Sequence, residues 1–512
     1  MRQSLFRALL RLHFITPLGL IRWAYCLASE GVTLMAALKF SARYHPTECA
    51  LVEERLVMNY SELYQYACRL ARLMYTDHNL RRGDTVAMLC RNHTVSLLLL
   101  PALSRLGVNV RLLNTDLGVE KTKELLNRRS CKLLVYDKDW KEDRGTFAPP
   151  CPSIETNVLY EKLFAKEEDS TFSLPTVFHG PAITVMTGGT SGQYTEASRH
   201  PSVTQFLSPF FALLREVGIG EYASVFLALP FYHGFGLATL IVSLLMGKKI
   251  CLMRQFEADQ ALKMIQNEEV EVLPLVPVML ARMWQQEGAK EKMKSLRCII
   301  SGGDHLDHKL AETTRSQLGN VLYNLYGTSE AGFFLLATPD DLSRCAETTL
   351  GKPIRGVKCK VVDKDSEGVG TLWVRSSWAM MGRNDQWQST GDLVMQNNEG
   401  YFFHRGRSDG LVVCGGENAW PDNVIRALSQ HPAVVASHVY AAPHPEFGNV
   451  LNARIELRKD SVLLPEDVRQ WLAPRISRAE MPHEIIFGHI ETLSTGKISS
   501  IHHETIYHEL EN

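Results

Sequence analysis

The stretch DTVAMLC, residues 84–90, begins the part of the chain that decides the fold, because strands and helices are predicted to alternate from there on. Apolar residues at helical spacing indicate helices, and short apolar runs indicate strands. The expected order is strand, helix, strand, helix, strand, at 84–90, 94–106, 109–113, 119–127 and 132–136. This alternation is typical of a parallel, doubly wound sheet, so the sequence predicts an α/β fold.

The pattern extends to both sides of this stretch. A helix is predicted over 59–74, and residues 138–174, which are charged and contain proline, are expected to form an irregular connection. Alternation resumes over 182–324, and a hairpin over 358–374 predicts a small β subdomain within the same large N-terminal domain. The predicted strands of the second alternating part are the apolar runs 225–229, 249–253, 272–276 and 297–300.

A domain boundary is predicted near Gly406–Asp409, where charged residues are typical of a solvated connection. The chain beyond it has the pattern of a small α+β unit. Its predicted strands are 410–414, 437–441 and 453–457, and its predicted helices are 421–429 and 466–472.

The bulk composition is that of an ordinary globular protein. The chain has 512 residues, too many for one simple core, so more than one domain is expected. A formal net charge of −1 argues against a nucleic-acid partner, which would need a strongly basic face. The 11 cysteines include no CxxC pair, so they fit neither a zinc cluster nor a compact disulfide framework, and a cytoplasmic protein is expected.

Residues 1–30 form a distinct amphipathic segment. Residues 1–29 contain four arginines and no acidic residue, and Pro17 separates a basic, leucine-containing half from an apolar half. No uncharged stretch reaches the roughly 18 residues of a membrane span, and no small-residue cleavage site marks a signal peptide. Two hypotheses stay open: peripheral membrane contact through residues 1–28, and a helix packed on the protein's own body.

The stretch NLYGTSEAG, residues 324–332, combines three side chains suited to a nucleotide. Tyr326 offers an aromatic face for a base, Thr328 a hydroxyl for a phosphate, and Glu330 a carboxylate for Mg²⁺. An ordinary turn at a strand end would explain the same letters when they are considered alone. The predicted nucleotide contacts here are Asn324, Tyr326 and Gly327, with Glu330 as the metal ligand.

The stretch TGGTSG, residues 187–192, follows an apolar strand over 182–186. Its glycines let backbone N–H groups converge on an anion. It is not a Walker loop, because no Gly-Lys-Ser/Thr follows, and a flexible glycine-rich turn is the alternative. The predicted phosphate contacts are Thr187, Gly188, Gly189, Thr190, Ser191 and Gly192.

Further motifs lie in order along the chain, and each alone would be an ordinary turn, a structural histidine or a surface charge. Glycines in SGGD let the backbone approach an adenine edge, an aspartate can accept from ribose hydroxyls, and an arginine can add a second contact. The motifs are YHGFG at 232–236 with His233, SGGD at 301–304 with Gly302, Gly303 and Asp304, STGD at 389–392 with Asp392, GRSD at 406–409 with Arg407, and STGK at 494–497 with Lys497.

As an ordered set these motifs resemble the adenylate-forming (AMP-binding) superfamily, which includes acyl- and aryl-CoA synthetases, firefly luciferase and the adenylation domains of peptide synthetases. The resemblance runs from about Tyr44 to about Ser500, nearly the whole chain. The stretch CGGENAWP, residues 414–421, resembles acyl-CoA synthetases in particular. With the apolar N-terminus and the segments 91–93 and 112–114, it looks most like bacterial long- or medium-chain fatty acyl-CoA synthetases.

The resemblance implies an acid–thiol ligase that uses ATP, Mg²⁺ and CoA. A fatty or similarly apolar carboxylic acid would form an acyl-adenylate, and the acyl group would then pass to CoA or, alternatively, to the phosphopantetheine of a carrier protein. His233 would lie beside the carboxylate, and Lys497 would bridge carboxylate and α-phosphate when a mobile C-terminal domain closes, with Asp409 as its hinge. Gly415 and Gly416 would face the pantetheine arm. The expected parts are an adenylation domain over 31–406, a hinge over 407–410 and a mobile domain over 411–512.

One departure from the family pattern lies after the glycine-rich stretch. The family continues with proline and then lysine, whereas this chain has Tyr194 and Thr195, followed by Glu196. Charge compensation at the pyrophosphate is therefore in question, and Arg199 is the nearest cationic substitute in the sequence. A degenerate, non-catalytic relative is the alternative that this departure raises, against which the joint presence of Glu330, Asp392, Arg407 and Lys497 argues.

Overall fold

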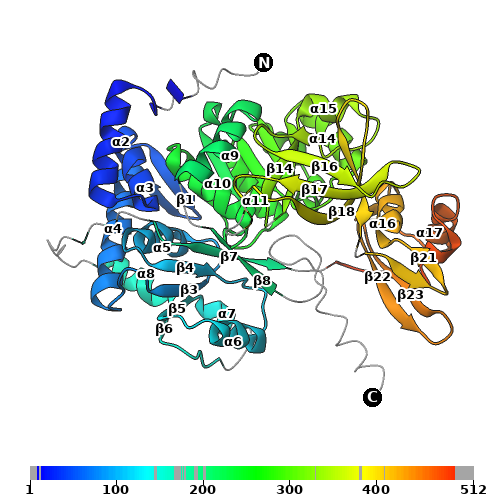
Figure 1. Ribbon diagram of the computed structural model, residues 1–512, viewed down its shortest axis with the longest axis horizontal. Helices are drawn as coiled ribbons and strands as arrows, with labels where there is room; N and C mark the ends of the chain where they lie inside the picture. The colour runs from blue at the N-terminus through cyan, green and yellow to red at the C-terminus, as the bar shows by residue number, and fades with distance from the viewer. Residues whose placement is uncertain are drawn as a thin grey trace.

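The computed structural model describes residues 9–490 with some gaps, and it confirms the predicted α/β fold class. A large N-terminal domain and a small C-terminal domain lie along the long axis of the molecule (Figure 1). The gaps are 11–12, 143–146, 166–173, 176, 178–179, 189–193, 200–202, 329, 380–382, 384, 409 and 460.

The larger sheet of the N-terminal domain has nine strands in the order β15-β14-β13-β12-β11-β9-β10-β1-β2. Its centre, from β13 to β1, is parallel, and antiparallel strands close both edges. The strands are β1 Cys49–Glu53, β2 Leu56–Asn59, β9 Ser224–Leu227, β10 Lys249–Leu252, β11 Val272–Leu275, β12 Cys298–Gly302, β13 Leu322–Thr328, β14 Gly332–Ala337 and β15 Lys352–Pro353.

The second sheet has six strands in the order β6-β5-β3-β4-β7-β8, of which all but β8 are parallel. It contains the three strands predicted from residues 84–136, each within two residues of its expected bounds. The strands are β3 Thr85–Leu89, β4 Asn109–Leu112, β5 Leu133–Tyr136, β6 Ser153–Glu155, β7 Ile183–Gly188 and β8 Tyr194–Arg199.

Neighbouring side chains of a strand point to opposite faces of its sheet, so each strand can contribute to two cores. One of these cores lies between the two sheets and is shared by them. Val86 and Met88 of β3 belong to this shared core, whereas Ala87 and Leu89 belong to a separate outer core. In the larger sheet, Val225 of β9 faces the shared core, and Phe226 faces a third cluster on the other side. Helices thus cover both faces of each sheet, as a doubly wound architecture requires.

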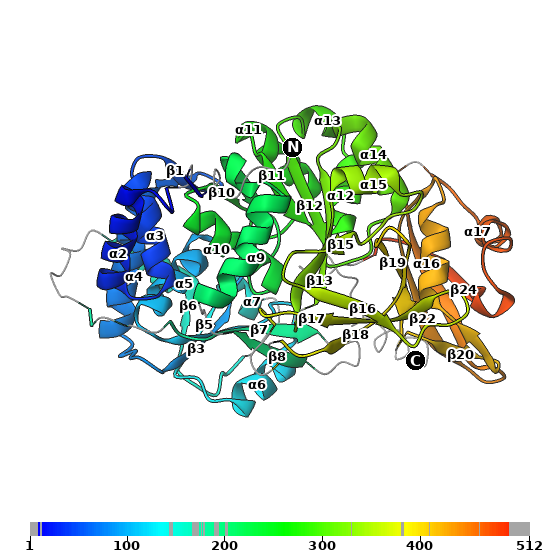
Figure 2. The ribbon, with the colours of Figure 1, turned by 45° about the horizontal axis from the view of Figure 1, so that its top comes forward.

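The helices form three layers around these sheets (Figure 2). The layer between the sheets holds α3 Leu34–Tyr44, α4 Tyr60–Thr76, α5 Thr94–Arg105, α8 Thr156–Phe164, α9 Val203–Glu216 and α10 Gly234–Leu245. The layer outside the larger sheet holds α11 Ala258–Asn267, α12 Pro277–Trp284, α13 Ala289–Lys292, α14 His308–Leu318 and α15 Pro339–Arg344. The layer outside the smaller sheet holds α6 Val119–Arg128 and α7 Lys138–Glu142.

A four-stranded antiparallel sheet forms the predicted small β subdomain, and the C-terminal domain follows it with its own core. Arg282 of α12 donates to Ile490 O at 2.7 Å, so the C-terminal domain contacts the large one directly. The elements are β16 Lys358–Val362, β17 Val369–Arg375, β18 Gln388–Gln396, β19 Phe402–Arg407, β20 Val412–Cys414, β21 Glu417–Ala419, α16 Pro421–Ser429, β22 Val434–His444, β23 Gly448–Leu457, α17 Pro465–Leu472 and β24 Glu484–Phe487.

One expectation from the sequence is wrong. Residues 138–174 are not simply irregular, because they include the short elements α7, β6 and α8; β6 is held by pairing with β5, which no local pattern reveals. Pro17, which separates the two halves of the N-terminal segment, begins α2, Pro17–Glu30, with Thr16 accepting from Gly19 N as the N-cap. Proline suits the first turn because its missing N–H needs no partner there.

Helix α2 packs through one face on α3, where Trp23 stacks on Phe40 with ring centroids 4.2 Å apart. Its end is fixed by the buried Glu30, whose carboxylate pairs with Lys39 and Arg105, each at 2.6 Å. Within the described part of the chain, none of the helices has the length and apolar character needed to cross a membrane.

Candidate active site

The predicted site residues lie where parallel strands of both sheets reach their carboxyl ends. Ser301 and Gly302 end β12, Tyr326 and Thr328 end β13, and Thr187 lies near the end of β7. In open α/β sheets, ligands bind in the crevice outside the carboxyl ends of the strands. The topology therefore brings motifs that are far apart in the sequence to one region.

Tyr326, Asp392 and Arg407 come from three different motifs, and Tyr326 and Arg407 both contact Asp392. The Tyr326 hydroxyl donates to Asp392 Oδ2, and Arg407 Nη1 lies 3.2 Å from Asp392 Oδ1. Strands β18 and β19 set the second contact, because Asp392 and Arg407 are opposite one another in their register. Asp392 is 7% exposed, so its charge is largely removed from water and depends on these donors.

The electrostatics of this cluster favour a neutral phenol beside a charged carboxylate. Burial, and then the Asp392 carboxylate, raise the pKa of Tyr326 well above its ordinary value. The hydroxyl therefore stays a proton donor to Asp392 throughout the neutral range. The edge of the Tyr326 ring meets Phe334, with centroids 5.2 Å apart, which also fixes the ring plane.

Close backbone packing accounts for the residue types next to this cluster. A Cβ on Gly302 would lie 2.7 Å from Leu325 O and 3.1 Å from the Phe235 ring, so no larger residue fits between β12 and β13. Gly303 has φ +82, a left-handed conformation that favours glycine. Asp304 after it is exposed, and Asn324 is buried with its amide donating to Thr349 O at 3.0 Å.

The acidic turn after β13 is only partly described. Glu330 is half-buried between β13 and β14, and Ala331 N donates to Thr328 Oγ1 at 3.1 Å, which shapes the turn. Carboxylate oxygens are ligands that Mg²⁺ prefers in proteins. The Glu330 carboxylate therefore fits the predicted ion. Gly327 is packed against β14, because a Cβ there would lie 2.4 Å from Gly332 O.

His233 is held at the amino end of α10 by a turn that depends on the other sheet. Asn92, which follows β3, donates to Leu227 O at 3.3 Å and Leu229 O at 2.9 Å and accepts from Phe231 N at 3.1 Å. His233 N then donates to Pro230 O at 3.1 Å and closes the turn. Asn92 is 2% exposed, and sequence patterns did not reveal this role because all three partners lie more than 130 positions away.

A second buried network lies beside this turn and was also missed. Asp137 accepts from His93 Nε2 and Thr156 Oγ1, both at 2.8 Å, and from Arg91 N at 2.9 Å, while Arg254 Nη2 lies 3.2 Å away. With Cys90, these groups lie close enough to suggest a metal site. The short His93–Asp137 contact is instead a hydrogen bond, so the network is complete without an ion.

The glycine-rich stretch connects two antiparallel strands. Gly188 of β7 pairs with Tyr194 of β8, and Ile183 pairs with Arg199, so Arg199 lies five residues along β8 from the start of the connection. That spacing corresponds to roughly 17 Å along a strand, which is longer than an arginine side chain. Compensation by Arg199 remains a prediction, and this register places it at a distance from the stretch it would serve.

Several predicted residues lie outside the described residues: Gly189, Thr190, Ser191, Gly192, Asp409 and Lys497. The hinge and the bridging lysine therefore stay predictions. Gly415 and Gly416 are described, and they form the turn of the β20–β21 hairpin with φ values of +58 and +85. Gly415 N donates to Phe447 O at 2.9 Å, which ties this turn to the loop between β22 and β23.

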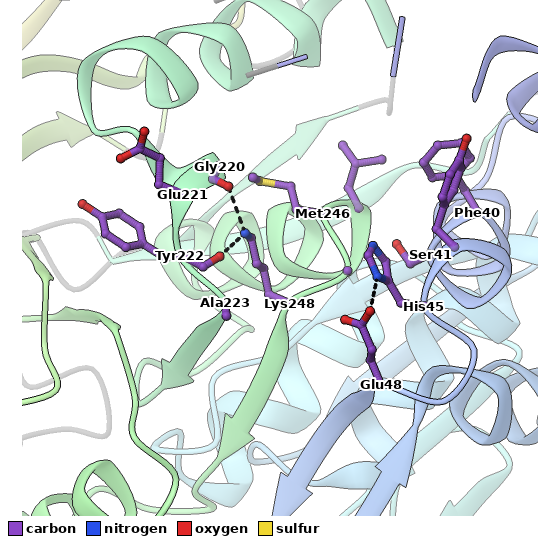
Figure 3. A pocket seen from close by; sticks show the side chains of 13 residues that line it. Phe40, Ser41, His45, Glu48, Gly220, Glu221, Tyr222, Ala223, Met246 and Lys248 are labelled. Atoms are coloured by element: carbon purple, nitrogen blue, oxygen red, sulfur yellow. Dashed lines mark hydrogen bonds and ion pairs between the residues drawn. The ribbon is translucent and has the colours of Figure 1, made fainter. Parts of the chain in front are cut away.

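A cavity of about 240 Å³ lies at the opposite ends of the strands and contains none of the predicted site residues (Figure 3). Its lining includes Ala223 and Lys248, which immediately precede β9 and β10, together with side chains of α3. Lys248 donates to the carbonyls of Gly220 and Tyr222, which also line the cavity. This position separates the cavity from the chemistry at the carboxyl ends.

Comparison with known proteins identifies the family of this chain. A model of the AMP-binding enzyme family matches residues 38–382, more than half of the chain. The chain belongs to the AMP-binding enzyme family. A model of the AMP-binding enzyme C-terminal domain matches residues 426–497 of the same chain, and membership of the adenylate-forming superfamily is thus confirmed.

Curated relatives of this AMP-binding enzyme include CoA ligases. The 2-succinylbenzoate–CoA ligase of Bacillus subtilis is 26% identical over 457 residues, which cover 86% of this chain and 91% of that protein. A putative acyl–CoA ligase of the same organism is 24% identical and covers 82% of this chain and 88% of that protein.

Solved structures agree with the fold of this AMP-binding enzyme. The o-succinylbenzoate CoA synthetase of Bacillus subtilis, in complex with an acyl-adenylate intermediate, has a TM-score of 0.75 at 23% identity, covering 91% of this chain and 97% of that chain. ATP-bound MatB from Rhodopseudomonas palustris has a TM-score of 0.76 at 21% identity, covering 94% of this chain and 100% of that chain.

Proposed function

We propose that this AMP-binding enzyme is an ATP- and Mg²⁺-dependent ligase that joins a carboxylic acid to CoA through an acyl-adenylate. In the first step a carboxylate oxygen attacks the α-phosphorus of ATP and pyrophosphate leaves. In the second step the CoA sulfur attacks the acyl carbon, AMP leaves, and the thiol proton passes to solvent. The observation that supports this best is the contact of both Tyr326 and Arg407 with Asp392, because three separate motifs contribute these residues.

The geometry of Asp392 suits a ribose. A carboxylate has about four acceptor positions, and the described residues occupy only part of them, with Tyr326 on one oxygen and Arg407 on the other. Two vicinal hydroxyls could therefore each donate to Asp392, and Arg407 would balance the charge. The Tyr326 ring, fixed by its hydroxyl and by Phe334, would present a face to the base.

Charge at the phosphates would be balanced by a different set of groups. Glu330 would hold Mg²⁺, which neutralises part of the triphosphate charge when bound. Thr328 and the residues of 187–192 would donate to phosphate oxygens, while His233 on its fixed turn would lie on the acid side. Lys497 would contribute a charge that acts only during adenylation.

The identity of the acid is a finer question. Two of the four relatives named above, a ligase and a synthetase, carry succinylbenzoate in their names, and none of the four is named for a fatty acid. A fatty acid therefore stays a prediction from the sequence, and 2-succinylbenzoate is the first acid to compare with it. Fatty-acid and lipid metabolism receive no support from these relatives.

The test is ATP–pyrophosphate exchange across a panel of acids that includes 2-succinylbenzoate, benzoate and fatty acids of short, medium and long chain. Exchange with any acid supports adenylation, and the thioester is then sought by mass spectrometry with CoA and, separately, with a holo carrier protein. Arg407→Ala serves as the site variant and Arg405→Ala as its matched control, because Arg405 lies on the same strand but pairs with Glu347 at 2.6 Å.

The outcomes separate the three hypotheses. Thioester with CoA supports the proposal, and thioester with the carrier protein alone assigns the acceptor differently. ATP binding without exchange for any acid would favour the non-catalytic relative that Tyr194 and Thr195 suggest.

A further inference from the structure

Helix α2 presents an entirely apolar face outward. Every residue of the helix that is classed as exposed is apolar. The largest exposed fractions are 68% for Ile21, 56% for Leu18, 55% for Leu20 and 49% for Tyr25. The exposed residues are Pro17, Leu18, Leu20, Ile21, Ala24, Tyr25, Leu27 and Ala28.

This face is concentrated rather than scattered. Five of the fourteen large apolar side chains that are exposed among the described residues belong to α2, a helix of 14 residues. Single exposed apolar residues are normal on any surface, whereas a contiguous patch marks an interaction site. The opposite face is firmly fixed, since Trp23 stacks on Phe40 and Glu30 is held by Lys39 and Arg105. The exposed face is thus a property of a docked helix.

Positive charge borders the apolar face. The Arg43 guanidinium lies 4.2 Å from the centre of the Tyr25 ring, and the Arg22 guanidinium lies 4.2 Å from the centre of the Tyr44 ring. Residues 1–44 hold six basic residues and one acidic residue, in a chain whose formal net charge is −1. That single acid is Glu30, which is buried in its ion pairs and offers no negative charge to the surface.

We propose that the α2 face binds the surface of an anionic lipid bilayer, with Leu18, Ile21 and Tyr25 inserted and Arg22 and Arg43 at the headgroups. The arginines match the negative charge of such a surface, and a tyrosine under an arginine suits the boundary between headgroups and acyl chains. The helix is about 21 Å long, which suits lying in the interface and is too short to span it.

A second copy of this chain fits the same face less well. Two α2 faces in contact would place the arginines of one copy beside those of the other, with no exposed acidic residue on α2 or α3 to pair with them. Like charges brought together oppose association. The charge pattern therefore favours an anionic surface over self-association.

The position of α2 leaves the C-terminal domain unobstructed. In both views α2 lies at one end of the long axis and the C-terminal domain, with α16 and α17, lies at the other (Figures 1 and 2). Binding through α2 would thus leave the C-terminal domain in solution. This inference concerns the surface alone and does not depend on the proposed activity.

The test is co-sedimentation of the full chain with vesicles of phosphatidylcholine alone and of phosphatidylcholine with phosphatidylserine. We expect binding to the anionic vesicles, weakened when salt rises from about 0.1 M to about 1 M, because the screening length falls from about 10 Å to about 3 Å. Ile21→Glu should lower the partition coefficient by at least roughly tenfold, because the variant loses the burial of an isoleucine side chain and adds a negative charge. Arg43→Glu should lower it several-fold.

Matched controls keep the test specific to α2. Val57→Glu and Val462→Glu also place a charge on exposed apolar residues, which are 61% and 87% exposed, but they lie outside α2 and should bind like the wild type. Thermal unfolding of each variant checks that the fold is intact. Absence of vesicle binding by the wild type, or equal binding by Ile21→Glu, would overturn the proposal. Lipid-free dimerisation abolished by Ile21→Glu, without vesicle binding, would overturn it in favour of a second copy.

Discussion

Asp392 and Asp137 are both buried aspartates with a histidine near Oδ1 and an arginine near the carboxylate. They differ in the number of donors that contact their carboxylate oxygens. Asp137 accepts two donors on Oδ1, and on Oδ2 it has Arg91 N and Arg254, whereas Asp392 has one described donor on each oxygen within 3.5 Å. A carboxylate whose acceptor positions are all occupied by protein donors holds parts of the protein together. A carboxylate with unoccupied acceptor positions is suited to binding a ligand.

The surroundings of the two residues agree with this difference. Asp137 is fully buried and lies where β5 meets the segment after β10, so it connects the two sheets. Asp392 pairs with Arg407, whose side chain is 37% exposed, at the junction that precedes the C-terminal domain. Variants of the two residues should therefore separate stability from catalysis.

The largest expected effect concerns catalysis alone and lies with Lys497. Removal of one preorganised charge typically costs on the order of 10²–10³ in rate. Lys497→Ala should reduce acyl-AMP formation by that factor, leave transfer from supplied acyl-AMP to CoA largely intact, and leave the urea unfolding midpoint unchanged. Lys364→Ala, at an exposed lysine of the β16–β17 connection, is the control. Normal pyrophosphate exchange by Lys497→Ala would remove this residue from the site.

The second prediction concerns stability alone. Asp137→Asn should lower the free energy of unfolding by about 3 kcal/mol, because it leaves Arg254 and the His93 turn without their buried charge. Asp139→Asn, at a partly exposed neighbour that also pairs with Arg254, should cost less than about 1 kcal/mol. Urea titration measures both. A normal unfolding midpoint for Asp137→Asn would show that the network is not the connection between the sheets.

The third prediction concerns Arg407, which contacts the Asp392 carboxylate. Arg407→Ala should reduce kcat/KM for ATP by roughly 10- to 100-fold, because a charged donor to the nucleotide contact is lost. Its effect on stability should be small, since the Arg407 side chain is 37% exposed. Steady-state exchange kinetics measure the effect against Arg405→Ala. Equal kinetics in these two variants would contradict the nucleotide role of the Asp392 cluster.

The smallest expected effect is on how the stabilities of the wild type and of Asp137→Asn depend on acidic pH. Burial by itself would raise the pKa of Asp137, but contact with His93, then Arg254 and the Arg91 N–H, lowers it below the ordinary value of 3.8. A lowered pKa in the folded state contributes stability that is present above the ordinary pKa and is lost as pH falls through the folded one. The stability gap between wild type and Asp137→Asn should therefore narrow on acidification below that value. A gap that is constant with pH would mean that the charge is not the source of the effect.

Elements whose signals are local were predictable from sequence. Helix α16 has its predicted bounds, Pro421–Ser429, because a proline at the first turn and a periodic apolar face both lie within the helix itself. Tyr326, Asp392 and Arg407 were each named from motifs that a family resemblance could align, although their contacts with one another were not predicted. In each case the deciding residues are recognisable without knowledge of the fold.

Features that depend on distant contacts were not predictable. Strand β6 is three residues long and exists through its pairing with β5. Asp137 and Asn92 act through partners on other elements, so their types and spacing alone carry no signal. The outward face of α2 was anticipated as apolar, but only the structure shows that the helix is docked and exposed at once.

The Asn92 amide has a consequence for protein engineering. Its NH₂ group donates to one carbonyl oxygen at the end of β9 and one just after it, and its oxygen accepts from Phe231 N, so the two sheets are joined by a set of matched hydrogen bonds. A chimera that exchanges the smaller sheet between homologues must carry residues 91–93 together with 227–231 of the same parent. Crossovers placed between them would combine mismatched halves, even where each parent folds well alone.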